Sequence, residues 1–505
     1  MGIKRHKKSL LYLFRYRNLL LEVEKMGEKV STKDALEKYG IMIFISFIAC
    51  YLYKLSYKGY VAVLICAILV TPSIILNGYR SAYMKRRFND VQKYILKMLD
   101  SYKKSGKIYT SLRSIVDAFE PGEMKTAILK AIDIIENDPE ANVEVKALDV
   151  ISREFENERV RILHKYLLSV EFNGGDYTLG IDMLSDDSQK WILRVKELQQ
   201  RRAALKGTII GSIVFTLGLC LILLYVPEFI PAIKEYVDIS ENAFVQISAV
   251  LFIISLLVYY RAVSKKLADS WMDEHKALSV EKEEKRYQMI IDYDAKKERT
   301  KSLIYAAVSM AITSVVFILF RQNYLVVLGI VISAFLLNSH KLSCNILKKQ
   351  LERDIKMQFP SWLLNVALKL QYENVQMAIA KSYEEAPGVI RPAIREMLLK
   401  LDDDPESQKP FNEFMKGIDV EEIKEAVSTL YDISQTSRDQ SDSQFKDLIK
   451  RNNEMIDRSE KLKNEDKITL LNGLIIVPEL FGSAKLIVDL CILLLSFFGM
   501  TNSMI

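Results

Sequence analysis

Long apolar runs alternate with charged runs along this chain. The apolar runs lie at 41–53, 60–77, 207–226, 243–260, 302–320, 325–338 and 468–500. An α-helix needs about 20 mostly apolar residues to cross a membrane, and flanking lysines shorten that requirement by snorkelling. The last run is longer than one crossing needs, which predicts either one kinked helix or a broken pair. The pattern therefore predicts an all-α membrane protein with about seven transmembrane helices, four of which form two tight hairpins.

Two long polar blocks separate these apolar runs, at 78–206 and 339–467. Apolar residues recur at helical spacing in the first block, and its first helix is predicted to bury the face formed by Phe88, Val91, Ile95, Met98 and Tyr102. Six such segments follow one another with short turns between them, and none has the alternation of a strand. We therefore predict that each block is a six-helix bundle.

These runs and blocks divide the chain into eight parts. The predicted parts are a basic N-terminal segment (1–39), hairpin 1 (40–77), bundle 1 (78–206), transmembrane helices 3 and 4 (207–263), a charged helical linker (264–301), hairpin 2 (302–338), bundle 2 (339–467) and a C-terminal transmembrane segment (468–505). The basic segment is predicted to form either an amphipathic helix on the membrane surface or a solvated helix with one apolar face.

A proline recurs at a fixed separation in the two blocks. Pro139 and Pro405 are 266 residues apart, and so are Pro121 and Pro387, each of which precedes a glycine. The same separation carries hairpin 1 onto hairpin 2 and the third span into the last apolar run. These observations predict an internal duplication, in which the unit of hairpin, bundle and span occurs twice.

Acidic residues flank two of these prolines. Asp138 and Asp404 are each predicted to cap a helix that begins at the following proline, with a glutamate in its positively charged first turn. Such helix starts lie at the ends of a bundle, where polar loops can meet a partner without disturbing the core. The predicted partner-contact residues are Asp138, Pro139, Glu140, Asp402, Asp403, Asp404, Pro405 and Glu406. A cation site at the three consecutive aspartates is the weaker alternative.

The fourth span, 243–260, has no counterpart in the predicted duplication. Each repeat crosses the membrane three times, so one extra crossing returns both bundles to the same side. Segments that flank the bundles, such as 78–87 and 341–353, are rich in Lys and Arg, whereas the loop 227–242 is acidic. By the positive-inside rule, this pattern predicts a multi-pass cell-membrane protein whose N-terminus and both bundles are cytoplasmic.

Composition and motifs limit the chemistry. The net charge of +6 is too small to indicate nucleic-acid binding, and the four histidines and five cysteines have no metal-ligand spacing. The run Ser105-Gly106-Lys107 lacks the rest of a phosphate-binding loop. We therefore predict no enzyme activity, no cofactor and no metal. Lys485 and Asp489 lie deep in the last apolar run, where they either mark a transport path or neutralise each other across one helical turn.

Several short motifs resemble those of one family of membrane proteins. In the second block, residues 358–360 (Gln-Phe-Pro) resemble a glutamine–leucine–proline helix start, and 378–386 with Pro387 resemble a second helix and the turn after it. In the first block, Gly106 matches a glycine that follows the first helix. Together with the architecture, these motifs resemble the type II secretion system F-domain family. Its members are the platform proteins of type II secretion systems, type IV pili, tight-adherence pili and the archaellum.

Each block departs from the family pattern at some positions. The first block has the family's glycine pair, Gly174-Gly175, but lacks the glutamine–proline start, and the second has Glu373 where the first glycine belongs. The resemblance implies two fused copies of a non-enzymatic platform in the lipid bilayer. Such a platform couples a separate cytoplasmic P-loop secretion ATPase to the assembly of pilin-like subunits. The resemblance is also compatible with a homo-oligomer of this chain. The alternatives are a membrane transporter or channel with cytoplasmic regulatory helical domains, and a membrane-bound sensor scaffold.

Overall fold

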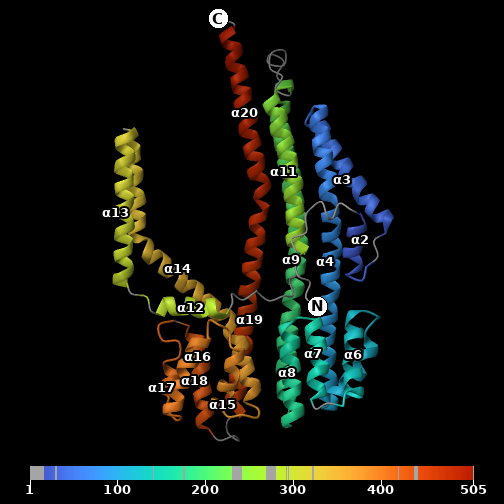
Figure 1. Cartoon of the computed structure of the whole chain (residues 1–505), viewed down its shortest axis with the longest axis vertical. Coiled ribbons are helices and arrows are strands. Elements are labelled where there is room, and N and C mark those ends of the chain that lie inside the picture. The colour runs from blue at the N-terminus through green and yellow to red at the C-terminus, as the bar shows by residue number, and fades with distance from the viewer. Residues whose placement is uncertain are drawn as a thin grey trace. The chain divides into compact units, whose positions relative to one another are not determined.

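The computed structural model describes most of the chain. The described residues are 16–28, 31–139, 142–174, 177–229, 241–268, 280–291, 293, 295–320, 323–418, 420–436 and 442–503. Within them the chain forms 18 α-helices and short 3₁₀ helices, without a strand (Figure 1). The predicted all-α class is therefore confirmed for this part of the chain.

The chain divides into two compact units. The first comprises Met1–His164, Trp191–Glu274 and Asn464–Ile505, and the second comprises Lys165–Lys190 and His275–Lys463. Helices of the first unit are α2 (Tyr16–Glu24), α3 (Thr32–Leu52), α4 (Tyr57–Ser105), α5 (Ile108–Ile115), η1 (Val116–Ala118), α6 (Glu123–Asn137), α7 (Val143–Glu154), α11 (Ala243–Ala268), η3 (Gly473–Ile475) and α20 (Val477–Ser503). Helices of the second are α12 (Val280–Ile291), α13 (Ala295–Phe320), α14 (Asn323–Lys369), α15 (Val375–Ser382), η2 (Tyr383–Glu385), α16 (Arg391–Asp403), α17 (Lys409–Asn412) and α18 (Glu421–Gln435). The helices α8 (Glu158–Asn173), α9 (Thr178–Phe229) and α19 (Asp442–Asn472) contribute residues to both units.

Four helices are long and apolar enough to cross a membrane, namely α3, α4, α9 and α11. A fifth candidate lies in α14, where Gly329–Asn338 and Lys341–Lys369 meet at a bend of 46°. The described residues thus support a multi-pass membrane protein with four or five spans, where the sequence predicts about seven. The predicted span at 302–320 is not among these candidates, and neither is α20, which carries Glu479, Lys485 and Asp489, so these two spans stay predictions.

Helix α4 of the first unit runs without a break from the apolar hairpin into the first polar block (Figure 1). It ends where the sequence predicts, because Gly106 adopts the left-handed conformation (φ 63°) and its N–H donates to the carbonyl of Tyr102 at 2.8 Å. The predicted face of this helix is buried, and Phe88 packs edge-on against Trp191 with ring centroids 5.3 Å apart. The helical periodicity therefore identified the core of this block.

Within the basic N-terminal segment, residues 16–24 form α2, and two of its apolar side chains are covered by protein. Leu19 and Val23 are buried in one cluster with Ile75 and Tyr83 of α4. Arg86 of α4 pairs with Glu28 at 2.9 Å, just after α2. Burial of this apolar face against α4 provides the stabilisation that a helix of nine residues lacks in isolation.

The last apolar run contains a helix break, as one of the two sequence alternatives predicts. Helix α19 ends at Asn472, a 3₁₀ turn follows, and α20 begins at Val477. Because Pro478 has no N–H, the carbonyl of Leu474 loses its helical donor. The Tyr259 hydroxyl donates to that carbonyl, and Ser212 donates to the carbonyl of Ile475 at 3.0 Å. Side chains of α11 and α9 thus satisfy the backbone groups that the break exposes.

The core of the second unit is built on α14. Trp362 and Phe359 of this helix pack against Phe414, and the Trp362 and Phe414 rings are stacked with centroids 6.2 Å apart. The indole N–H of Trp362 donates to the Ser382 hydroxyl at 2.9 Å, which in turn donates to the carbonyl of Ile379 at 2.7 Å. Every polar group in this buried series of hydrogen bonds has a partner. The series therefore fixes how these helices pack, in addition to the apolar contacts.

Candidate functional site

The two recurring prolines lie in turns that follow helix ends. Asp138 closes α6 in an extended conformation (φ −88°, ψ 119°), and Asp404 closes α16 in the same way (φ −144°, ψ 93°). The next helices begin only at Val143 and Lys409. The predicted N-caps are therefore wrong. The physical reason is that a proline disfavours the α conformation of the residue before it, so each helix stops at its aspartate.

The predicted partner-contact residues therefore surround helix C-termini. Asp402, Asp403, Asp404, Pro405 and Glu406 are exposed in the second unit. Carboxylates near a helix C-terminus face the negative end of its dipole, which is unfavourable. In the first unit, Asp138 is paired with Lys146 at 3.2 Å, Pro139 is exposed, and Glu140 lies outside the described residues. The role of these residues as partner contacts stays a prediction.

Close packing explains the glycine of the second proline–glycine pair, Gly388. A Cβ at Gly388 would lie 2.7 Å from the carbonyl oxygen of Val280 and 2.8 Å from Glu283. Helix α12 therefore approaches this turn more closely than any side chain would permit. Burial raises the pKa of the Glu283 carboxyl, and Gln358 partly offsets that effect by hydrogen bonding. Part of the predicted charged linker is thus docked on the second block.

The second unit contains a pocket that the sequence did not predict. It lies between α14, α18 and α19, and its volume is about 310 Å³. The lining residues are Lys356, Phe359, Pro360, Val420, Glu422, Ile423, Met455, Arg458, Ser459, Lys461 and Leu462. Ser459 donates to the carbonyl of Met357 at 2.8 Å, which ties α19 to α14 at the base of the pocket. Helical periodicity shows which residues each helix buries but does not show which helices meet.

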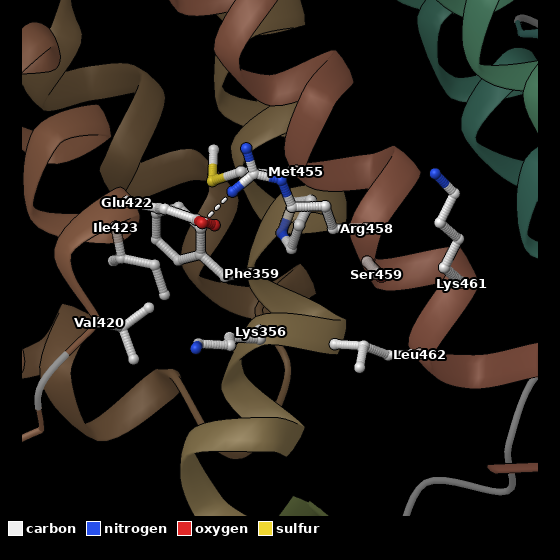
Figure 2. Close-up of a pocket in the computed structure, with 11 residues that line it drawn as sticks. Lys356, Phe359, Val420, Glu422, Ile423, Met455, Arg458, Ser459, Lys461 and Leu462 are labelled. Atoms are coloured by element: carbon white, nitrogen blue, oxygen red, sulfur yellow. Dashed lines mark hydrogen bonds and ion pairs between the residues drawn. The ribbon is translucent and has the colours of Figure 1, made fainter. Parts of the chain in front are cut away.

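Figure 2 shows how this pocket combines an apolar floor with a charged rim. Phe359, Val420 and Ile423 are buried and form the floor. Arg458 forms an ion pair with Glu422 at the rim, whereas Lys461 points away from the other labelled side chains and pairs with Asp457 at 3.0 Å. The arrangement is suited to bind an apolar group that carries negative charge beside it.

Lys485 and Asp489 form a buried ion pair on α20. Their side chains are 1% and 0% exposed, and one carboxylate oxygen accepts from the ammonium. The other oxygen, Oδ2, has no hydrogen-bond partner among the described residues. The predicted pairing across one helical turn is confirmed. Glu479, another ionisable residue of the last apolar run, is exposed.

Close packing of α20 on α9 encloses this pair in the first unit. A Cβ at Gly482 would lie 2.2 Å from Cγ2 of Thr216, so only glycine permits the contact. The Cys220 thiol donates to the carbonyl of Gly482 at 3.6 Å, and the Tyr53 hydroxyl donates to that of Leu217 at 2.9 Å. The charges are thus held inside helix packing.

A buried histidine joins three helices of the first block. His164 Nε2 lies 2.7 Å from the Tyr94 hydroxyl, and Nδ1 lies 2.7 Å from the Ser152 hydroxyl. Burial lowers the pKa of His164 to about 3, so the imidazole is neutral at physiological pH. Both ring nitrogens are occupied by hydroxyls of neighbouring helices, and these two hydrogen bonds assign the imidazole to the core.

Comparisons of the chain with known protein families, with curated proteins and with solved structures found no match. Among the described residues there is also no group of three or more His, Cys, Asp or Glu side chains that is placed to hold a metal ion. The function is therefore inferred from the architecture of the protein and from the surfaces described above.

Proposed function

We propose that this chain is a cell-membrane platform of a type II secretion or tight-adherence pilus machine. In this proposal it docks a separate cytoplasmic P-loop secretion ATPase and transmits the motion of that ATPase to pilin-like subunits. The N-terminus and both polar blocks lie in the cytoplasm. The protein itself has no enzymatic activity and binds no nucleic acid.

The observation that carries the proposal is a repeated order of helices. Helices α5 and α15 both have eight residues, start 267 residues apart and continue into 3₁₀ helices of three residues. Helices α4 and α14 start 266 residues apart, at Tyr57 and Asn323. Each of these long helices leaves an apolar hairpin and enters a polar block. Elements of equal or nearly equal length at nearly the same separation are difficult to obtain by chance and support an internal duplication.

A similar correspondence of helices before the two hairpins supports the proposed duplication. Helix α2 packs on α4 in the first unit, and α12 contacts α14 in the second, where Arg286 pairs with Asp354 at 2.8 Å. Helix α11 has no counterpart. It is the one extra crossing that lets two fused repeats keep both polar blocks on the same side. That arrangement supports a cytoplasmic docking surface, since a motor acts on both blocks only if they face it together.

The second candidate is a transporter or channel, and the buried Lys485–Asp489 pair is the observation that favours it. In the platform proposal this pair is structural, because the two charges neutralise each other within one helix face. The sensor scaffold has no specific observation in its favour.

Co-purification tests the platform proposal. Tagged full-length protein is extracted from membranes of the cells that naturally produce it, and the proteins that co-purify with it are identified. We expect the ATPase to be recovered with the tagged protein. If neither the ATPase nor a pilin-like subunit is recovered from membranes with normal levels of the tagged protein, the platform proposal is wrong.

A further inference from the structure

We propose that the pocket between α14, α18 and α19 binds a segment of a cytoplasmic protein partner in which a large apolar side chain lies next to carboxylates. The chemistry of the segment follows from the pocket. That this partner is the secretion ATPase rests on the proposed function above.

The floor of the pocket specifies the apolar side chain. Phe359, Val420 and Ile423 expose no polar side-chain atom, and the half-buried Leu462 extends the apolar surface. A pocket of about 310 Å³ has room for a Phe or Leu side chain. Insertion of such a side chain removes apolar surface from water on both partners, which favours binding.

The rim of the pocket specifies the charge. Three cationic residues and one anionic residue line it, and the single carboxylate, Glu422, is already paired with Arg458. Lys356 has no carboxylate within 4 Å among the described residues, and Figure 2 shows it extending past Phe359 toward Val420. An incoming carboxylate therefore finds an ammonium group that no acid of the described chain neutralises. An incoming lysine would meet an excess of positive charge.

The position of the pocket favours a protein partner over a lipid headgroup. Lys356 lies 18 residues after Asn338, where the last candidate membrane segment bends. A helix rises about 1.5 Å per residue, so the pocket is separated from that point by about 27 Å of α14. That separation favours a soluble partner over headgroups of the membrane that holds α14.

Peptide selection on the full-length protein in nanodiscs tests the proposal. A phage-displayed library of random 12-residue peptides is selected on the wild-type protein and counter-selected on Leu462→Trp, which fills the pocket from a half-buried position. We expect the enriched peptides to combine Asp or Glu with Phe or Leu. No enrichment over the counter-selected variant, or enrichment of basic peptides, would overturn the proposal.

Titration of one enriched peptide then locates the contact. We expect Lys356→Glu to weaken binding at least tenfold, whereas Lys130→Glu, the same charge change on an exposed residue of α6, leaves binding unchanged. Equal effects of the two variants, or displacement of the peptide by phosphatidylglycerol vesicles, would exclude the pocket as a protein site. The peptide test and the co-purification test fail independently, because neither uses the readout of the other.

Discussion

The ammonium of Lys485 is paired with the carboxylate of Asp489 one helical turn away, and both side chains are buried where α20 packs on α9. A charge in such a place is tolerated only while its partner is present. This relationship separates the structural role of the pair from a transport role, because the two roles predict different results for single and double substitutions.

Removal of one charge should be more harmful than removal of both. Asp489→Asn leaves the Lys485 ammonium buried without a counter-charge, and we expect a loss of about 3–5 kcal/mol of stability. Lys485→Met combined with Asp489→Leu should restore stability to near that of the wild type. The measurement is the thermal midpoint of the detergent-solubilised protein. A double variant that is no more stable than Asp489→Asn alone would contradict the structural role of the pair.

The contact between Gly482 and Thr216 can be tested by a substitution and its rescue. Gly482→Ala places a methyl group against Thr216 Cγ2, and overpacking of this kind costs about 1–3 kcal/mol. Thr216→Ser removes that methyl while keeping the hydroxyl that donates to the carbonyl of Ser212, so it should rescue the alanine variant. Gly211→Ala is the matched control, since nothing lies within 4 Å of its Cβ position. Equal destabilisation at both glycines would contradict the observed packing.

The neutral state of His164 predicts loss of stability in acid. The imidazole of the unfolded chain takes up a proton near pH 6.5, whereas the buried one resists protonation down to about pH 3. The unfolded state therefore binds more protons in that window, and the free energy of unfolding falls by about 1.4 kcal/mol for each pH unit below 6.5. Above pH 6.5 the free energy of unfolding should not depend on the His164 imidazole. Denaturation of wild-type protein and His164→Gln between pH 7 and 4 should show a shallower decline for the variant. Parallel pH profiles would refute the assignment.

Cysteine labelling tests the proposed orientation. In a variant without the five native cysteines, we expect a membrane-impermeant maleimide to label Glu235→Cys in intact cells. Lys130→Cys and Met377→Cys are on exposed surfaces of the two polar blocks and should react only after the membrane is opened. The charge asymmetry of the loops is the physical basis. Labelling of all three positions in intact cells would reject the shared cytoplasmic location.

Charge reversal at the acidic turn tests the predicted partner contacts. We expect replacement of Asp402, Asp403 and Asp404 by lysine to weaken ATPase association and pilus assembly. Folding should be maintained, because positive charge near the C-terminus of α16 interacts favourably with the helix dipole. The measurement is recovery of the ATPase with wild-type and mutant protein at equal membrane levels. Undiminished recovery would remove this turn from the interface.

The sequence by itself determined the local structure of this protein. Apolar spacing identified the buried face of α4 from Phe88 to Tyr102, since that spacing depends only on the 3.6-residue helical period. Gly106 marked a helix end because its left-handed conformation is a property of the residue. The pairing of Lys485 with Asp489 followed from their spacing of four. The end of α6 at Asp138 also follows from the sequence. Pro139 restricts the backbone of the residue before it, and this restriction outweighs the capping preference of the aspartate.

Only the tertiary structure decided which of these elements meet. Met357 and Ser459 are 102 residues apart, and their hydrogen bond brings together the helices that form the pocket. The apolar periodicity of α14 and of α19 does not specify that these two helices are in contact, because their contact depends on the simultaneous packing of many side chains. The same holds for Tyr259, whose hydroxyl reaches the carbonyl that Pro478 leaves without a donor. Local sequence sets what each helix buries and where it ends, and packing in three dimensions sets which buried faces cover one another.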